Sequence, residues 1–245
     1  MTMHPRVLKW QELAKARNGV EEDYEIIRRE SIRLAEEEQK AAKTQQLVGK
    51  VPLRFRNKSF SDYVANSSEQ IRVKNIAERF VSTFDERLEQ GTCGFFLGNP
   101  GTGKTFLSLI MYQALAQAGY SAHYESTLQF LKTLQTKRFE SEHAFKSIMN
   151  FYKSIQFLVL DEISESISKN GYPSEYEQKM LFEIVNARYE KKELCTLIIS
   201  NRDKAELLNR LGQPILDRLS EKSVTLIFDW ESYRTHTINI GKGEI

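Results

Sequence analysis

The stretch GNPGTGKTFL, residues 98–107, decides the fold of this chain. Its first six residues hold three glycines and a proline, which suit neither a helix nor a strand. The apolar stretch before it, residues 94–98, predicts a buried strand, and the run from 106 to 118 predicts a helix that ends at Gly119. The stretch is therefore predicted to be a loop that leads from a strand into a helix.

This loop fits the phosphate-binding pattern G-x-x-x-x-G-K-[ST], the P-loop, and a strand–loop–helix setting is the context that the pattern requires. Its glycines let backbone N–H groups wrap a polyphosphate, and the helix N-terminus adds its positive end. Lys104 is expected to reach the phosphates and Thr105 to contact Mg²⁺. The alternative is a glycine turn that matches by chance. The predicted ATP-binding set is Gly98, Asn99, Pro100, Gly101, Thr102, Gly103, Lys104, Thr105 and Phe106.

Two later apolar runs, residues 155–162 and 195–201, end in polar side chains. Asp161 ends the first run, where an aspartate can hold Mg²⁺ through water, and Glu162 is placed to polarise an attacking water as a general base. Adjacent acids at a strand end can also serve solubility alone. Asn201 ends the second run and can orient water against a γ-phosphate, or it can be a helix N-cap or a turn residue before Asp203.

The strands are continuous apolar runs that alternate with helices, which predicts a parallel sheet covered on both faces. We therefore expect a three-layer αβα domain of the α/β class. Further helices are predicted over 174–191, 204–211 and 213–219, and a last strand over 223–230.

The first 50 residues differ from the rest, because they are rich in charged and other helix-forming residues. A narrow apolar stripe in them predicts a helical arm, which is either a solvated extension or a partner-binding element. Residues 51–68 indicate a linker, and 69–245 form the predicted ATPase domain. Ser67 and Gln70 have the spacing of a capping box at its first helix, whose apolar face is predicted over residues 73–88. Ser126 and Gln129 have the same spacing before a helix that is predicted to extend through Lys137.

Bulk properties exclude several other classes of protein. The formal net charge is +2, so any nucleic-acid binding must come from a local patch. Cys93 and Cys195 form no CxxC pair, and the four histidines show no zinc-site spacing. The sequence has neither a signal peptide nor an apolar stretch of 18 residues, so we expect a cytoplasmic protein without membrane contact.

The motifs, in this order, resemble an AAA+ ATPase of the DnaC-type bacterial helicase loaders, which include prophage-encoded versions and share a group with IstB. They are the P-loop, LVLDE (158–162), IISN (198–201) and ILDRL (215–219). The most specific stretches are residues 175–188 and IFDWESYR (227–234). The resemblance covers the chain from about residue 60 to its end.

The resemblance implies that Lys104 and Thr105 bind ATP and Mg²⁺ and that Asp161 and Glu162 form the Walker B pair. Asn201 becomes the sensor I residue, and Arg218 the arginine finger that reaches a neighbouring subunit's ATP. Family members often have another arginine where this chain has Pro214. From the residues alone, Arg218 would be an ordinary surface arginine.

The resemblance also raises the question of a helical lid, for which the residues after the last strand are too few. Little or no C-terminal lid is therefore expected. Arg234 is a candidate to replace a lid arginine in part.

Cations and aromatics alternate between residues 130 and 153, which suits single-stranded DNA. Phe130 and Leu134 fit a helix face on the core, so most of these aromatics are expected to be structural. The predicted DNA contacts here are Lys137, Arg138 and Phe139. Ser174 and Tyr176 match family positions that contact single-stranded DNA, although Tyr176 can equally pack on the sheet.

The sequence thus predicts an Mg²⁺-dependent ATPase that loads a DnaB-type replicative helicase hexamer onto single-stranded DNA, with hydrolysis controlling release. The arm would bind the helicase, and the ATP sites would mediate self-association. The alternative is an IstB-like helper of a DNA transposase. A small-molecule kinase would need an arginine-rich lid, and a module that only binds ATP would not need Glu162.

Overall fold

The structure is a computed structural model that describes residues 25–26, 28–29, 31–33, 51–163, 175–191 and 193–234. The chain divides into two compact units, Met1–Lys50 and Val51–Ile245. The described positions of the first unit are helical, and the Nε atom of Arg29 lies 3.7 Å from a Glu25 carboxylate oxygen. The rest of the predicted arm lies outside the described residues.

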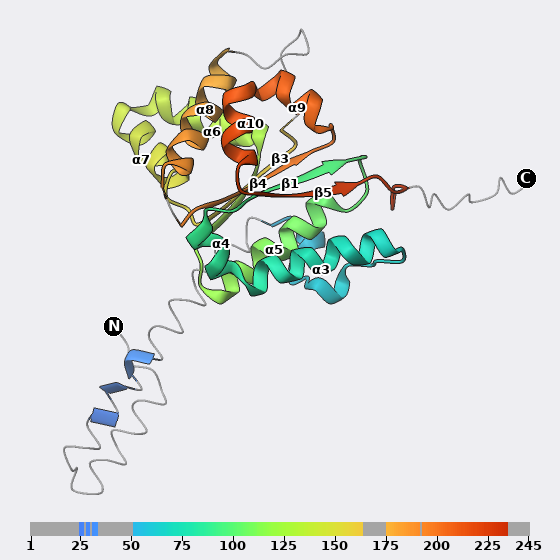
Figure 1. Cartoon of the computed structure of the whole chain (residues 1–245). Helices are drawn as coiled ribbons and strands as arrows, with labels where there is room; N and C mark the ends of the chain where they lie inside the picture. Colours follow the sequence, from blue (N-terminus) through green and yellow to red (C-terminus); the bar gives the residue numbers. More distant parts are fainter. Residues whose placement is uncertain are drawn as a thin grey trace, which may run out of the picture. The chain divides into compact units, whose positions relative to one another are not determined.

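The second unit is built on a parallel sheet of five strands (Figure 1). Their order across the sheet is β2-β3-β4-β1-β5, and each neighbouring pair is parallel. The predicted parallel sheet is therefore confirmed. The strands are β1 (Cys93–Gly98), β2 (Ala122–Ser126), β3 (Phe157–Asp161), β4 (Cys195–Ser200) and β5 (Ser223–Phe228).

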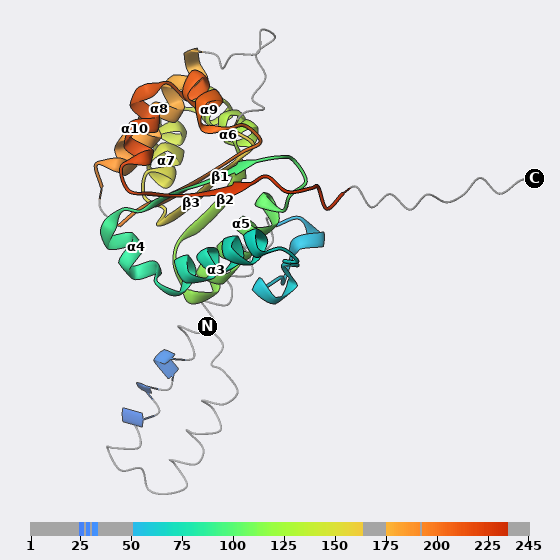
Figure 2. The ribbon, with the colours of Figure 1, turned by 45° about the vertical axis from the view of Figure 1, so that its right-hand side comes forward.

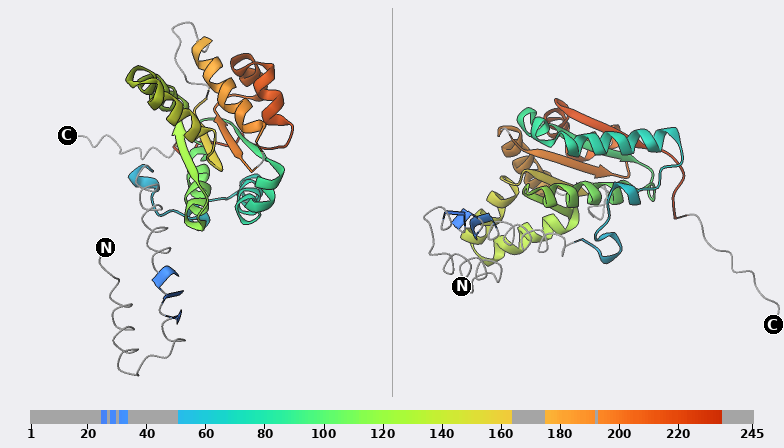
Figure 3. Two further views of the ribbon diagram at one scale, coloured as in Figure 1. Left: turned by 90° about the vertical axis from the view of Figure 1, so that its left-hand side faces the viewer. Right: turned by 90° about the horizontal axis from the view of Figure 1, so that it is seen from below.

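Helices cover both faces of the sheet, which gives the expected αβα layers (Figures 1 and 2). One face carries α3 (Ser68–Ser82), α4 (Phe84–Gln90) and α5 (Lys104–Ala118), and α3 and α5 lie side by side there (Figure 3). The other face carries α6 (Thr127–Glu140), α7 (Glu142–Tyr152), α8 (Glu175–Tyr189), α9 (Lys204–Leu211) and α10 (Gln213–Ser220).

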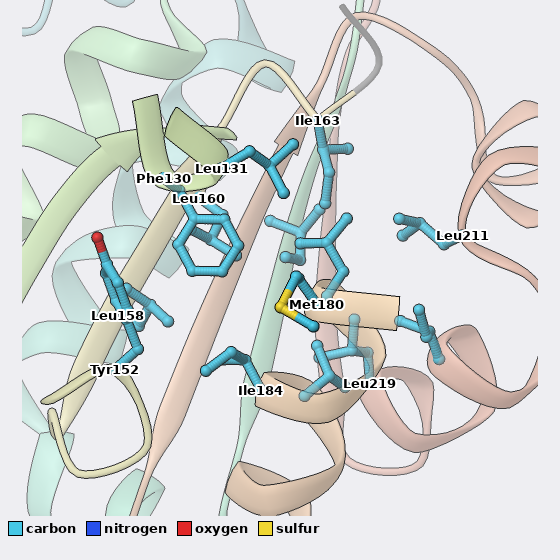
Figure 4. Close-up of a cluster of buried hydrophobic side chains, with 14 of the residues drawn as sticks. Phe130, Leu131, Tyr152, Leu158, Leu160, Ile163, Met180, Ile184, Leu211 and Leu219 are labelled. Carbon is cyan, nitrogen blue, oxygen red and sulfur yellow. The ribbon is translucent and has the colours of Figure 1, made fainter. Parts of the chain in front are cut away.

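The strands β3 and β4 are buried at every residue, which explains why their sequences are continuous apolar runs. Their side chains pack with those of α6, α8 and α10 in the core that Figure 4 shows. Phe130 and Leu134 are fully buried in this core, as expected. Full burial of each such side chain contributes about 1.5–3 kcal/mol. The edge strand β5 differs, because Ile227 is half exposed.

Two helix boundaries differ from the simple expectation. The predicted apolar face over 73–88 is shared by α3 and α4, which meet at Thr83. The helix that starts after Ser126 continues to Glu140, and a separate α7 follows. Ser141 starts α7 by accepting a hydrogen bond from the backbone N–H of Ala144 (3.0 Å).

The segment 51–68, for which the sequence indicates a linker, is packed onto α5. The side chain of Gln113 accepts a hydrogen bond from the Asn57 N–H (2.9 Å) and donates one to the Phe55 carbonyl (3.0 Å). Val51 and Tyr63 are buried. These contacts explain why the second compact unit begins at Val51 rather than at residue 69.

Candidate active site

The candidate site lies where the parallel strands end. Their carboxyl ends share one edge of the sheet, which is where open α/β sheets bind ligands. The P-loop follows β1, Asp161 ends β3, and Asn201 follows β4. Because β4 lies between β1 and β3, the topology places Asn201 between the P-loop and Asp161.

The P-loop backbone takes a shape that only glycine adopts without strain at three positions. Gly98, Gly101 and Gly103 have φ values of 122°, 77° and 92°. A Cβ atom at Gly98 would lie 2.3 Å from the Phe228 carbonyl oxygen, so the close approach of β5 also requires glycine. The helix α5 begins directly after the loop, so its positive end faces the same space.

The lysine and threonine of the motif are held at the loop. The Lys104 ammonium is buried and donates to the carbonyls of Gly98 (2.7 Å) and Asn99 (2.5 Å). The Thr105 hydroxyl donates to Asp161 Oδ2 at 2.8 Å. The two residues expected to contact Mg²⁺ are therefore in direct contact with each other.

The Asp161 carboxylate is almost completely buried, and burial raises its pKa above the usual aspartate value. Hydrogen bonds from Tyr124, Thr105 and the Glu162 N–H, with the charge of Lys104, oppose that rise. The side chain thus has donors on both oxygens and a cation nearby, the setting that a buried carboxylate needs to remain charged.

Glu162 is the adjacent acid, and its environment is different. Its side chain is exposed, it lines the cavity described below, and its φ of 56° is left-handed, which is uncommon for a residue other than glycine. Backbone strain of this kind costs about 1–3 kcal/mol and clusters at functional sites. The kink turns the chain at the strand end and leaves the carboxylate facing the cavity.

The alternative role of Asn201 as a helix cap is taken by another residue. Asp203 Oδ1 accepts from the Glu206 N–H at 2.8 Å, so Asp203 caps α9. Asn201 instead lines the same cavity as Lys104 and Asp161.

A cavity of about 540 Å³ joins these residues, a size typical of small-molecule sites. One wall comes from the segment 51–68 through Arg54, Phe55, Asp62, Tyr63 and Val64. The rings of Phe55 and Tyr63 lie 5.4 and 6.1 Å from that of Phe106. This apolar aromatic wall suits a planar base, whereas the P-loop side suits phosphates.

The segment after β5 packs against the P-loop from outside. The Tyr233 N–H donates to the Gly101 carbonyl (3.0 Å), and the Trp230 indole donates to the Thr102 carbonyl (3.1 Å). Tyr233 and Arg234 line the cavity. Arg234 is thus placed at the site, as its suggested role requires; residues 235–245 lie outside the described part.

The donor set fits ATP and Mg²⁺. The P-loop amides, the buried Lys104 and the N-terminus of α5 offer positive potential for phosphates. No group of three His, Cys, Asp or Glu side chains that could hold a metal is found among the described residues. A Mg²⁺ ion shared with phosphates needs only one or two carboxylates, and Asp161 with Thr105 provides matching ligands.

Several residues of the site were missed by the sequence reasoning. Tyr124 donates to Asp161 Oδ2 at 2.7 Å, and the segment 51–68, for which the sequence indicates a linker, forms one wall of the cavity. Strand order brings Tyr124 to the site, and no local sequence signature predicts this. Packing brings the segment 51–68 there, and its aromatic residues are the signal in the sequence that could have indicated a wall of the site.

Arg218 lies apart from this cavity. It lines a second cavity, of about 260 Å³, with Cys93 and Thr196 at the amino ends of β1 and β4. Its guanidinium donates to the Pro214 carbonyl at 2.8 Å and stacks over Phe182, 5.2 Å from the ring centroid. Among the described residues, Arg218 is thus not part of its own chain's P-loop cavity.

The candidate DNA-contacting residues differ in how exposed their side chains are. Phe139 is 83% exposed, Lys137 pairs with Glu140, and Arg138 stacks over Phe145 at 5.6 Å. Tyr176 is partly buried against the core, which matches its alternative structural role. Ser174 lies outside the described residues.

No helix in the described part of the chain is long and apolar enough to cross a membrane.

Fold and site together define an α/β domain with a P-loop nucleotide-binding site. A model of the IstB-like ATP binding protein family matches residues 17–239. The chain therefore belongs to that family, and it is an ATP-binding ATPase of the DnaC/IstB type.

Individual relatives agree with this assignment. The chain is 29% identical to the replicative helicase loader DnaC of Buchnera aphidicola subsp. Schizaphis graminum over 203 residues, 81% of this chain and 79% of that protein. It is 30% identical to an IS21 insertion-sequence protein of Pseudomonas aeruginosa that its name assigns to ATP binding, over 56% of this chain and 51% of that one. A crystal structure of the DnaC helicase loader has the same fold, with a TM-score of 0.64 and 22% identity over 73% of this chain and 100% of that chain.

Proposed function

We propose that this protein is a replicative helicase loader, which binds a DnaB-type hexamer and places it on single-stranded DNA under the control of ATP. The observation that carries the proposal is the similarity to a replicative helicase loader over four fifths of both chains. The ATP site described above supplies the nucleotide-dependent step.

In this proposal the phosphates of ATP lie on the P-loop amides and on Lys104, and the base lies against Phe55, Tyr63 and Phe106. Mg²⁺ would be held by Thr105 and by Asp161 through water, and when bound it neutralises charge on the phosphates. Glu162 takes a proton from the attacking water, and Asn201 orients that water.

Arg218 acts on the ATP of a neighbouring copy. It lies at the amino edge of the sheet, away from the cavity that holds its own chain's nucleotide. Its contacts with Pro214 and Phe182 hold it at the exposed side of α10, where a second subunit can meet it. ATP therefore favours assembly, and hydrolysis releases it.

The arm, residues 1–50, binds the helicase, and the end of α6 with Lys137, Arg138 and Phe139 contacts single-stranded DNA. Exposed Phe139 can stack on a base, and the cations can pair with phosphates. The protein acts in the cytoplasm.

Size-exclusion chromatography with light scattering tests the proposal. The protein is mixed with a DnaB-type helicase from the same cell, in ATP, in ADP and without nucleotide, with and without residues 1–50. Co-elution that needs the arm is expected. Absence of co-elution under all three nucleotide conditions would overturn the loader function.

A second candidate function is that of an IstB-like transposase helper, which the family match and the insertion-sequence relative favour. This function predicts ATP-dependent binding to duplex DNA rather than to single strands. Fluorescence anisotropy with matched single- and double-stranded oligonucleotides, at one stated salt concentration, separates the two.

A further inference from the structure

Tyr124, in β2, contacts the Asp161 carboxylate, although no part of the motif contains it. Its hydroxyl donates to Asp161 Oδ2 at 2.7 Å, and the Thr105 hydroxyl donates to the same oxygen at 2.8 Å. The other oxygen, Oδ1, accepts from the Glu162 N–H at 2.8 Å. Three donors, from β2, from α5 and from the residue after β3, therefore fix the plane of this carboxylate.

The end of β2 is tied to Asp161 a second time. Thr127, the first residue of α6, donates its hydroxyl to the Asp161 backbone carbonyl at 2.9 Å. Ser126 pairs with Asp161 in the parallel sheet, and this register places the contacts of Tyr124 and Thr127 with Asp161 next to each other. The end of β2 and the start of α6 thus hold both the main chain and the side chain of Asp161.

A carboxylate offers about four lone-pair positions. Tyr124 and Thr105 use those of Oδ2, which leaves a position on Oδ1 beside the Glu162 N–H. A metal-bound water needs such a fixed acceptor, and hydrogen-bond partners of metal ligands commonly change metal affinity by about 10–100-fold when removed. Tyr124 is therefore well placed to orient Asp161 for the ion that accompanies ATP.

We propose that Tyr124 is a positioning residue of the Mg²⁺ site, whose hydroxyl orients Asp161 and so sets how strongly Mg²⁺ tightens ATP binding. This inference rests on the proposed ATP site. It concerns the ion rather than the nucleotide, because Tyr124 is not among the residues that line the cavity.

Tyr152 provides a matched control from the neighbouring α7. Its hydroxyl also donates to a carboxylate, here Glu125 Oε2 at 2.5 Å, although Tyr152 is buried and Tyr124 is partly buried. Glu125 follows Tyr124 in β2 and faces the other side of the sheet, because side chains alternate along a strand. Tyr152→Phe thus makes the same chemical change near the same strand without touching Asp161.

The test measures binding of a fluorescent ATP analogue to the full chain, first with EDTA and then across a Mg²⁺ titration. Tyr124→Phe should leave the metal-free Kd within about twofold and raise the Mg²⁺ midpoint about tenfold or more. Tyr152→Phe should keep the wild-type midpoint. Thermal melts of both variants show that they are folded.

Two results would overturn the inference: a wild-type Mg²⁺ midpoint in Tyr124→Phe, or an equal shift in both variants, which would mean a general effect of packing around β2. Failure of the proposed ATP site looks different, because the wild-type protein itself would then not bind the analogue, with or without Mg²⁺.

Discussion

The two edges of the sheet each hold a buried cation, and the two cations are used in different ways. At the carboxyl edge, Lys104 lies in a loop of left-handed glycines and lines a cavity of about 540 Å³. At the amino edge, Arg188 is fully buried and donates to three carbonyls and to Thr196, at 2.7–2.9 Å.

Burial lowers the pKa of Arg188 to about 10, so it stays charged at neutral pH and ties α8 to the ends of α7 and β4. Its guanidinium donates only to groups of the protein itself, namely the three carbonyls and the Thr196 hydroxyl, in the hydrogen bonds that the structure describes. Arg188 also lines the cavity of about 260 Å³ at the amino edge, whereas Lys104 lines the larger cavity of about 540 Å³ beside the P-loop. A buried cation next to a cavity is therefore evidence for a binding site only together with a second feature, which at the carboxyl edge is the P-loop backbone.

The largest expected difference between the edges concerns two glutamates with left-handed backbones, Glu162 at φ 56° and Glu193 at φ 69°. Glu162→Gln should lower the kcat of ATP hydrolysis about 100–10,000-fold while ATP affinity is retained, because it removes the general base. Glu193→Gln, at the amino edge, should hydrolyse ATP at the wild-type rate. A phosphate-release assay with ATP-binding titrations measures both. Undiminished turnover in Glu162→Gln would remove the base assignment.

Arg188→Ala should affect stability rather than nucleotide binding. It leaves four acceptors without their donor, at about 1–3 kcal/mol each, offset in part by the relieved burial of the cation. We expect the free energy of unfolding, measured in urea, to fall by about 3–5 kcal/mol. Arg218→Ala is the control, because its exposed stacking contacts are worth about 0.5–1 kcal/mol. Equal stability of the two variants would contradict the structural role of Arg188.

The sequence predicts those parts of the fold that follow from local patterns. The P-loop, the apolar runs of β3 and β4, and the caps at Ser67 and Ser126 are local, and the structure has all of them. The parallel sheet followed from the lack of alternation in the strands.

What the sequence does not predict depends on distant contacts. Tyr124 reaches Asp161 because β2 and β3 are neighbours, and Phe55 lies against Phe106 in a segment that Gln113 binds through the Phe55 carbonyl. The role of Arg188 also depends on contacts that the sequence does not show. Its acceptors are Tyr152, Ile155, Cys195 and Thr196, which packing brings together. Such residues have no fixed spacing from the motifs, so no sequence pattern identifies them.

Lys104→Ala should weaken ATP binding by about 10–150-fold, which corresponds to about 1.5–3 kcal/mol for a hydrogen bond to a charged group. Lys153→Ala is the matched control, because its ammonium pairs with Glu183 at 2.7 Å outside the cavity. Isothermal titration with a slowly hydrolysed ATP analogue compares them. Similar affinity for both variants would show that the buried Lys104, like Arg188, serves the fold alone.

The smallest effect is expected at Gly91, the left-handed residue that ends α4 at the amino edge. A Cβ there would meet nothing within 4 Å, so Gly91→Ala should cost only the backbone strain of about 1–2 kcal/mol and leave ATP binding unchanged. Gly98→Ala is the comparison, because its Cβ would lie 2.3 Å from backbone of β5. It should displace the P-loop and lose ATP binding. Urea unfolding and ATP titration of both variants measure the difference, and normal ATP binding by Gly98→Ala would mean that the loop tolerates a shape other than the one described.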